Sequence, residues 1–486
     1  MTDPITVPAG LLHIDGKWTP SVDGNEVPVV NPATGEQIGS LAAGTSADVD
    51  LAVAAARRQF DGGQWSTLSG LDRARLLWRL ADLVEEHKED LAKLEALDIG
   101  RPFFEPMHIE LPSAVDTFRH FAGWADKVVG TTFNLADLMG RARTSYTIRQ
   151  PIGVVGAITP WNAPTMIASW KLAPALAAGN TIVLKSAEDA SLSTMLLVDL
   201  IDRAGFPPGV VNLVTGTGAT AGDALVRHPG VDKISFTGSP EVGSQIASLA
   251  ASSFKRVSLE LGGKSPQIIR PDVDLDDVIT TASIAIFANQ GQTCAAGSRL
   301  LVHEHVFDEF VERLVAFAEG VKVGDPFAED TQMGTLINAS QLARVTGLVE
   351  QGRSSDASLL TGGSRIGDRG YFFEPTLFVA SNENILAREE IFGPVGTIIR
   401  VSDDDEAIRV ANDTSYGLSA VVWTKDNDAV NRYAKALNAG TVWVNAWGVP
   451  HPAMPWLGMK TSGIGEELGA AGLMAETVER SINVIG

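Results

Sequence analysis

The chain has 486 residues, of which 45 % are apolar and only one is a cysteine. At about 150 residues per domain, this length predicts three domains or two large ones. Acidic residues outnumber basic ones by 59 to 38, and the resulting net charge of −21 repels phosphate backbones and anionic membranes. We therefore expect neither a nucleic acid nor a membrane as a partner.

The sequence also bears on the location of the protein. Residues 1–6 lack the cationic and then apolar pattern of a signal peptide, and no apolar run reaches the roughly 18 residues of a membrane span. A single cysteine cannot form an internal disulfide. These features favour a cytoplasmic location.

Short strands are predicted near the start of the chain, and long helices after them. The pattern over residues 11–32 is typical of strands around tight turns, with Asp15-Gly16 as a hairpin signal. Apolar residues then recur at spacings of three and four among charged ones, which predicts amphipathic helices over residues 52–60, 71–97 and 114–128.

From residue 151 onward, short apolar runs alternate with helical stretches. These runs cover residues 153–158, 181–185, 210–214, 233–236 and 256–260. The alternation predicts an α/β fold with a doubly wound parallel sheet, whose ligands lie at the carboxyl ends of the strands. We therefore expect a nucleotide, although Gly216, Gly218 and Gly222 miss the usual dinucleotide-binding spacing by one residue. A better anion site is the turn in which Ser239 can cap a helix that Pro240 begins.

A second alternating region extends from residue 263 to residue 445. Its predicted strands cover residues 300–302, 396–401, 419–423 and 440–444. This pattern predicts a second α/β domain. A helix predicted over residues 275–289 leads into a turn that holds Cys294, which we expect to lie in a loop between the two domains.

The neighbours of Cys294 bear on its role. A lone cysteine is most often an inert, buried, small hydrophobe. Here two glycines and three amide side chains flank the thiol within residues 289–297. Such a polar and flexible setting favours an exposed, reachable thiol.

A series of short motifs, in order along the chain, resembles those of the NAD(P)-dependent aldehyde dehydrogenase superfamily. They cover residues 159–162 (TPWN), 170–180 (WKLAPALAAGN), 185–188 (KSAE), 236–239 (FTGS), 259–264 (LELGGK), 291–294 (GQTC), 389–394 (EEIFGP) and 440–445 (GTVWVN). The resemblance extends from about residue 10 to the C-terminus, and chance agreement across all the motifs is negligible.

The resemblance implies a division of the chain into three parts. Residues 1–129 and 150–262 would form the NAD-binding domain, residues 263–465 the catalytic domain, and residues 130–149 and 466–486 a small oligomerisation β-extension. Alternating segments over residues 143–150 and 481–485 match this extension, and their exposed edges would otherwise invite uncontrolled pairing. We therefore expect a homodimer or a homotetramer.

The resemblance also assigns the chemistry. Cys294 resembles the nucleophile that adds to the aldehyde carbonyl to give a thiohemiacetal. The Asn162 side chain and the Cys294 backbone N–H match the oxyanion hole, where the loss of one donor costs roughly a hundredfold to a thousandfold in rate. Hydride transfer to the nicotinamide leaves a thioester, and Glu260 matches the glutamate that activates water to release the acid, with Lys171 as its helper. By composition alone, Asn162 could be a turn residue and Glu260 a solvated strand end.

The activation of the thiol is a separate question. No histidine adjoins Cys294 in the sequence, which disfavours a Cys/His hydrolase. We expect activation from the N–H groups of the turn itself, from the bound cofactor, or from Glu260 acting through water.

Glu188 decides the expected cofactor. Lys185 and Glu188 resemble the pair that holds the adenosine ribose, and Glu390 with Phe392 resembles the nicotinamide ribose clamp. A carboxylate accepts hydrogen bonds from free ribose hydroxyls but repels a 2′-phosphate, so NAD is favoured over NADP. By spacing alone, Glu188 could be a loop acid. The remaining cofactor positions are Ile158, Trp161, Ser186, Gly218, Phe236, Ser239 and Leu261, and no metal is expected.

Several residues depart from the family pattern. Ser186 replaces the usual proline, which we expect to loosen the cofactor loop. Leu457 stands where glycine is usual, and Glu466 where arginine is common. Val478 takes a place where many members have glutamate. If that glutamate assists release of the acid elsewhere, this chain would depend on its remaining catalytic residues.

The substrate funnel of the family maps onto uncharged residues here: Ala163, Met166, Trp170, Ala288, Thr293, Ala295, Pro450 and Trp456. An anionic semialdehyde usually requires an arginine to pair with its carboxylate. Ala163, Ala288 and Pro450 fall where relatives often carry phenylalanine, which predicts a wide apolar pocket for a bulky aliphatic, aromatic or terpenoid aldehyde. The alternative is that Trp456 refills the space, in a broad-specificity or semialdehyde dehydrogenase.

Two further classes stay open. A non-catalytic descendant would bind nucleotide or serve structurally, and it should lack a catalytic residue, yet Cys294, Asn162 and Glu260 are all present. A coenzyme-A-acylating relative would release its product to a thiol instead of water, and retention of Glu260 disfavours it.

Overall fold

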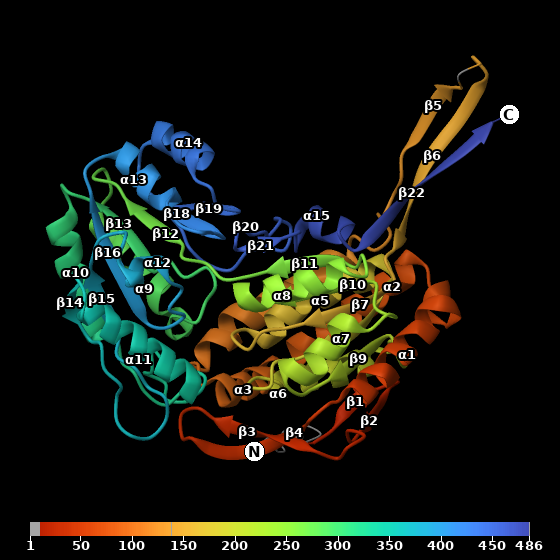
Figure 1. The fold of residues 1–486 in the computed structure, drawn as a ribbon, viewed down its shortest axis with the longest axis horizontal. Helices are drawn as coiled ribbons and strands as arrows, with labels where there is room; N and C mark the ends of the chain where they lie inside the picture. Colours follow the sequence, from red (N-terminus) through yellow and green to blue (C-terminus); the bar gives the residue numbers. More distant parts are fainter. Residues whose placement is uncertain (1–9, 138, 486) are drawn as a thin grey trace.

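The computed structural model describes residues 10–137 and 139–485. The opening segment considered above for a targeting signal lies outside the described residues, as do residues 138 and 486. The fold is of the α/β class and has two large sheets with helices around them and a narrow three-stranded arm (Figure 1). The described part of the chain contains no helix with the length and apolarity that a membrane crossing requires.

The first large sheet confirms the predicted doubly wound parallel sheet. Its strands have the order β2-β1-β9-β8-β7-β10-β11-β21, and the pairs from β9 through β11 are parallel. The bounds are β1 (Leu12–Ile14), β2 (Lys17–Thr19), β7 (Val154–Ile158), β8 (Thr181–Lys185), β9 (Val211–Val214), β10 (Lys233–Thr237), β11 (Arg256–Glu260) and β21 (Gly463–Ile464). The predicted runs were close to these bounds because central strands bury both faces and are therefore continuously apolar.

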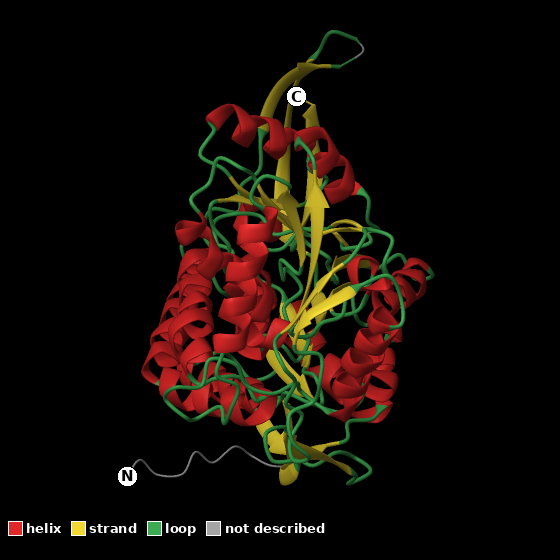
Figure 2. Ribbon diagram, turned by 90° about the vertical axis from the view of Figure 1, so that its left-hand side faces the viewer, coloured by secondary structure: helices red, strands yellow, loops and turns green. Residues whose placement is uncertain are grey.

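Helices pack on both faces of this sheet, and Figure 2 shows helices on either side of the strands of the molecule. Alternate residues of one strand serve opposite cores: Val155 and Ala157 of β7 pack on one side, and Val154 and Ile158 on the other. The first core also takes residues of α2 (Gly70–Glu86), α4 (Leu111–Ala122), α5 (Pro164–Ala178) and α6 (Leu192–Ala204). The second takes residues of α1 (Ser46–Gly62), α7 (Asp223–Arg227) and α8 (Pro240–Ala251).

The helix predicted over residues 71–97 is in fact two helices. The break lies at His87, whose φ of −98° and ψ of 17° are not helical, and α3 (Lys88–Ile99) begins at the next residue. The apolar pattern hides this break because both helices pack onto the same interior. The helix predicted over residues 114–128 lies at Leu111–Ala122 and is followed by Gly123.

The second large sheet has the order β14-β15-β16-β13-β12-β18-β19. Its strands are β12 (Pro266–Ile269), β13 (Arg299–His303), β14 (Ser358–Thr361), β15 (Thr376–Val379), β16 (Val395–Val401), β18 (Ser419–Trp423) and β19 (Thr441–Val444). Its helices are α9 (Leu275–Phe287), α10 (Phe307–Gly320), α11 (Ala339–Arg353), α12 (Ile385–Arg388), α13 (Asp404–Asn412) and α14 (Asn427–Ala436). The predicted second α/β region is thus present, although β12, β14 and β15 were not predicted.

A three-stranded arm projects from the body of the molecule (Figure 1). It joins β5 (Thr132–Ala136), β6 (Ala142–Pro151) and the C-terminal β22 (Thr477–Ile485) in the order β22-β6-β5. Smaller elements are the β3 (Glu26–Asn31) and β4 (Glu36–Ala42) hairpin, the β17 (Tyr416–Gly417) and β20 (Met459–Lys460) pair, and α15 (Gly469–Met474). The domain boundaries and the oligomeric role of the arm stay predictions.

Candidate active site

Cys294 lines a cavity of about 350 Å³. The sequence-predicted residues that line it with the thiol are Trp161, Asn162, Ser239, Leu261, Glu390 and Phe392. Sequence analysis missed other lining residues, chiefly Thr237, Glu241, Gln341, Arg344 and Tyr416. One side of the cavity comes from the first large sheet and the loops after its strands, and the other from α11 and loops of the second α/β region. This agrees with the expected place of Cys294 in a loop between the two regions.

The carboxyl ends of the parallel strands bring further predicted residues together. Ile158 at the end of β7 pairs with Lys185 of β8 on one side and with Phe236 of β10 on the other. Thr237, the next residue of β10, pairs with Glu260 at the end of β11. These positions therefore form a row along one edge of the sheet, where ligands of such sheets bind.

The turn before Cys294 has an unusual backbone. After α9 ends at Phe287, Asn289 and Gln290 adopt left-handed conformations with φ of 48° and 55°. Gly291 follows with φ of 70°, and a Cβ there would lie 2.0 Å from the Gly393 carbonyl oxygen, so only glycine fits. This turn ends the helix abruptly and presents the thiol to the cavity.

Asn162 is held against this turn. Its Nδ2 donates to the Gln292 carbonyl at 3.0 Å, and its own carbonyl accepts from Nδ2 of Asn289 at 2.8 Å. An amide nitrogen carries two hydrogens, so one N–H of Asn162 is left for a ligand in the cavity. This arrangement fits the predicted oxyanion donor.

The surroundings of the Cys294 thiol favour its neutral form. Burial and, after it, the carboxyl groups of Glu390 and Glu260 raise its pKa to about 12. The backbone N–H groups of Cys294 and Ala295 oppose this shift without overcoming it. Which of the three expected sources activates the thiol stays a prediction.

Glu260 is buried without compensation. Its residue is 3 % exposed, and neither carboxyl oxygen has a hydrogen-bond partner within residues 10–137 and 139–485. Burial raises the pKa of Glu260 well above its ordinary value, the nearby Glu467 raises it further, and Lys171 lowers it. A carboxyl group that is reluctant to ionise is suited to take up and release a proton.

Lys171 contacts a glutamate that sequence analysis overlooked. Its Nζ lies 2.6 Å from Glu467 and 3.1 Å from the Ser235 hydroxyl. Val478, at the position where a missing glutamate was suspected, pairs with Gln150 in the arm. Glu467 therefore supplies a carboxylate beside Lys171 that was not predicted from the sequence. Sequence reasoning examined Glu466 instead, since nothing in the pattern tells which of the two adjacent glutamates faces inward.

The predicted ribose pair is formed, but away from the thiol. Lys185 lies 2.8 Å from Glu188. Burial raises the pKa of Glu188, but Lys185 and backbone N–H groups, including that of Gly218, bring it below its usual value. The Ser186 hydroxyl lies 2.7 Å from that of Ser191, a contact that a proline at this position could not make. As far as the described residues go, this group lies outside the lining of the Cys294 cavity.

The N-terminus of α8 and the Glu390 carboxylate lie at the cavity. Ser239 caps α8 by accepting from the Val242 N–H at 3.3 Å, which confirms the predicted cap. Glu390 accepts from the Gly263 N–H at 2.9 Å, and burial raises the pKa of Glu390 to about 7. A Cβ at position 262 would lie 2.0 Å from this carboxylate, so glycine permits the close approach. Phe392 meets Trp161 edge to face at 5.2 Å.

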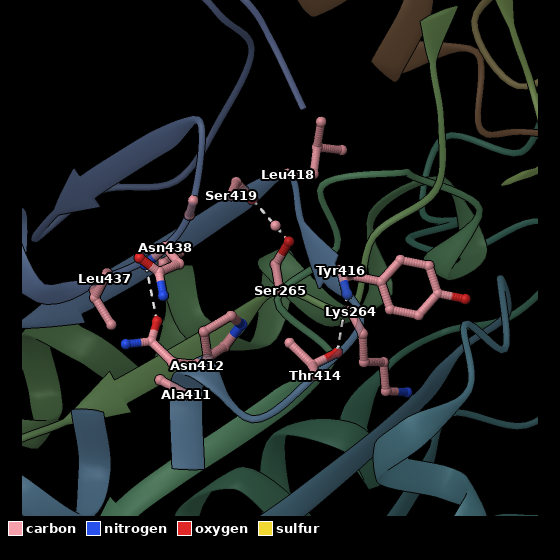
Figure 3. A pocket seen from close by; sticks show the side chains of 14 residues that line it. Lys264, Ser265, Ala411, Asn412, Thr414, Tyr416, Leu418, Ser419, Leu437 and Asn438 are labelled. Atoms are coloured by element: carbon pink, nitrogen blue, oxygen red, sulfur yellow. Dashed lines mark hydrogen bonds between the residues drawn. The ribbon is translucent and has the colours of Figure 1, made fainter. Parts of the chain in front are cut away.

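Lys264 lines a small pocket with Tyr416 and Thr414 (Figure 3). Its Nζ has no hydrogen-bond partner among the described residues. Burial and then the charge of Arg299 lower the pKa of Lys264 to about 7, while Glu390 opposes this shift. The Lys264 ammonium in turn lowers the pKa of Glu390, so the charges of the two groups depend on each other.

The predicted substrate positions surround Cys294 with apolar surface. Ala163, Met166, Trp170, Ala295 and Trp456 belong to one buried cluster against which Cys294 packs. The rings of Trp170 and Trp456 lie 6.0 Å apart, and those of Trp443 and Trp456 lie 6.1 Å apart. Ala288, Thr293 and Pro450 are half-buried. Trp456 is 2 % exposed, so part of the space that small residues leave is filled.

Comparisons with known proteins identify the family of the chain. Residues 18–482 match the model of the aldehyde dehydrogenase family. The mitochondrial aldehyde dehydrogenase of Homo sapiens is 46 % identical over 97 % of this chain and 91 % of that protein. The mitochondrial benzaldehyde dehydrogenase of Antirrhinum majus is 45 % identical over 96 % and 87 %. The solved NAD+ complex of aldehyde dehydrogenase from Bacillus cereus superposes with a TM-score of 0.96 at 41 % identity, over 98 % of this chain and 96 % of that chain. The chain therefore belongs to the aldehyde dehydrogenase family and is an oxidoreductase that acts on aldehydes.

Proposed function

We propose that this enzyme uses NAD to oxidise a bulky, apolar aldehyde to its carboxylic acid through a thioester on Cys294. One observation carries this proposal. A thiol, a free amide N–H of Asn162 and a helix N-terminus converge on a single cavity, and Glu260 lies at the adjacent strand end. Such a set provides a nucleophile, an oxyanion donor, an anion site and a base.

The residues of the cavity fit NAD. The N-terminus of α8 with its Ser239 cap can receive a pyrophosphate. The Thr237 Oγ1 is buried without a hydrogen-bond partner within the described chain, and it faces the same cavity. Glu390 can accept from ribose hydroxyls. NAD bound in this way would accept a hydride from the substrate.

The first half of the reaction uses Cys294 and Asn162. The sulfur forms a bond to the carbonyl carbon, and the oxygen that gains charge receives N–H groups from Asn162 and from the Cys294 backbone. The thiol loses its proton to solvent in this step, and Glu260, whose oxygens are unoccupied, stays free as the base of the second half. Loss of hydride from the same carbon then leaves a thioester on Cys294.

The second half is hydrolysis. Glu260 takes a proton from water, the water oxygen adds to the thioester carbon, and the C–S bond breaks to give the acid and the free thiol. The buried Lys171 and Glu467 next to Glu260 support this role, since their charges set its pKa in opposite directions. A coenzyme-A-acylating enzyme has no use for this base, which favours hydrolysis.

NAD is preferred over NADP in this proposal. The Glu188 carboxylate is ionised and lies beside Lys185, so it can bind ribose hydroxyls and repels a 2′-phosphate. The apolar walls around Cys294 favour an uncharged substrate. The relative from Antirrhinum majus, a benzaldehyde dehydrogenase, supports an aromatic aldehyde.

The test is an aldehyde panel read by nicotinamide absorbance. Acetaldehyde, octanal and benzaldehyde would each be assayed with NAD and with NADP. We expect the highest kcat/KM for the bulky aldehydes with NAD. Ala288→Phe should lower kcat/KM for benzaldehyde by at least about tenfold and leave acetaldehyde little changed, since the added ring occupies the half-buried position beside the substrate. A preference for acetaldehyde in the unmodified enzyme would refute the wide pocket.

We also propose a homodimer or homotetramer that assembles through the arm. The arm exposes Phe133, Leu135 and Val484, each more than two-fifths exposed, on strands with free edges. Sedimentation analysis of the enzyme and of a Phe133→Lys variant would test this surface. A cytoplasmic location remains a proposal that cell fractionation would test.

A further inference from the structure

A buried cluster of charges lies directly behind the oxyanion site. Arg101, which is 3 % exposed, contacts Glu110 through Nη1 and lies 2.9 Å from Glu105 through Nη2. Glu95 is also buried and close enough for its charge to act on Arg101. One guanidinium therefore serves three carboxyl groups, of which those of Glu95 and Glu110 are buried.

This cluster holds the two segments that carry the oxyanion donors. Arg101 Nη1 lies 3.4 Å from the Asn162 carbonyl oxygen. Both oxygens of Glu105 accept from the Asn289 N–H at 3.2 Å, at the left-handed turn before Cys294. Through one side chain, Arg101 connects the loop of Asn162 with the turn of Cys294.

A third contact fixes the far side of the Asn162 loop. The Glu95 carboxylate accepts from the Thr165 N–H at 3.2 Å, in the first turn of α5. Asn162 therefore lies between two anchors, both of which belong to the same charge cluster.

The chemistry of this position calls for arginine. A guanidinium presents several N–H donors in a plane, so it can reach two carboxylates and a carbonyl together, whereas an ammonium is a point charge. The left-handed turn costs free energy for residues other than glycine, and it persists only when its surroundings hold it. Glu105, itself oriented by Arg101, provides such a hold at Asn289.

We propose that Arg101 is a positioning residue that sets the oxyanion donors of Asn162 and Cys294 through its contacts with Glu105 and the Asn162 carbonyl. This role rests on the proposed function of Cys294 and Asn162. It extends that function to a residue outside the cavity lining.

The test separates two reactions of the same thiol. Addition to an aldehyde requires the oxyanion donors, whereas alkylation by iodoacetamide forms no oxyanion. We expect Arg101→Lys to slow the pre-steady-state NADH burst by roughly tenfold to a hundredfold, because a misplacement on the order of 1 Å has effects of this size. The alkylation rate of Cys294 should stay within about twofold, and the KM for NAD should change little.

Arg270→Lys is the matched control. Arg270 pairs with Asp404 at 2.9 Å and with Asp272 at 3.2 Å, at the end of β12 and outside the cavity lining. The Arg270→Lys variant should retain the wild-type rates of both the NADH burst and the alkylation of Cys294. Glu105→Gln keeps an acceptor for the Asn289 N–H but loses its charge. It should therefore also slow the NADH burst without slowing alkylation, but by a smaller factor than Arg101→Lys. This variant tests the proposal if Arg101→Lys fails to fold.

A double variant tests the route of the effect. In an Asn162→Ala background most of the Arg101→Lys loss should vanish, because the donor that it positions is absent. The proposal would be overturned if the two substitutions multiplied their effects on the burst rate in the double variant. It would also be overturned if Arg101→Lys slowed the burst and the alkylation equally, or if Arg270→Lys slowed the burst but not the alkylation. A wild-type enzyme without any aldehyde-dependent burst would instead overturn the proposed function itself.

Discussion

Replacing Glu260 with glutamine should separate the two halves of the proposed reaction. Glutamine has nearly the same shape but cannot take a proton from water. A general base contributes roughly a hundredfold to ten-thousandfold in rate, or about 3–5 kcal/mol of barrier. We therefore expect steady-state turnover to fall by that factor, while a burst of up to one NADH per active site remains.

The same variant should change stability with a definite sign. Burial raises the pKa of Glu260 above its unfolded value, so the native state binds more protons than the unfolded state between the two pKa values. The contribution of Glu260 to the free energy of unfolding is fully present below its pKa in the unfolded state. This contribution is lost as the pH rises through its pKa in the native state. Glu260→Gln cannot ionise and therefore avoids this loss of stability at high pH. The Tm of the variant minus the Tm of the wild type should therefore increase from pH 5 to pH 9.

Rapid-quench NADH measurements and thermal melts at several pH values would check both expectations. Cys294→Ala is the matched control, since it should abolish the burst as well as turnover. Unchanged turnover in Glu260→Gln, or a burst that falls together with turnover, would refute the assignment of hydrolysis to this residue.

Three further predictions concern neighbouring groups. Lys171→Met leaves the buried Glu467 without its ion-pair partner, so it should destabilise the fold by about 3–5 kcal/mol in denaturant titrations. It also removes a charge that lowers the pKa of Glu260, so the pH midpoint of hydrolysis should rise. An unchanged midpoint would contradict the coupling between the two residues. Because the Cys294 pKa is about 12 without cofactor, its alkylation by iodoacetamide should accelerate about tenfold per pH unit from pH 7 to 9, whereas a plateau near pH 8 would show an activated thiol. Glu188→Gln removes a charge that repels a 2′-phosphate, so the NADP to NAD ratio of kcat/KM should rise at least about tenfold, with unchanged benzaldehyde KM as the control.

The sequence predicted the elements whose pattern is local. β8 and β11 have the predicted bounds because central parallel strands are apolar on both faces, and the Ser239 cap could be read from Ser-Pro at a helix start. The one cysteine and its glycine-rich turn were visible as a candidate site, and the motifs around them identified the family. These features depend on neighbours within a few residues.

Tertiary structure alone decided the partners of the buried charges. Lys171 meets Glu467 across 296 residues, and which of two adjacent glutamates faces it depends on the backbone of the C-terminal segment. Arg101 reaches Asn162 across 61 residues, and no local pattern indicates that contact. The pKa values of Cys294 and Glu260 follow the same rule, because burial and distant carboxylates set them. Electrostatic interactions act through space between segments, so the sequence determined which groups exist and the fold determined what they experience.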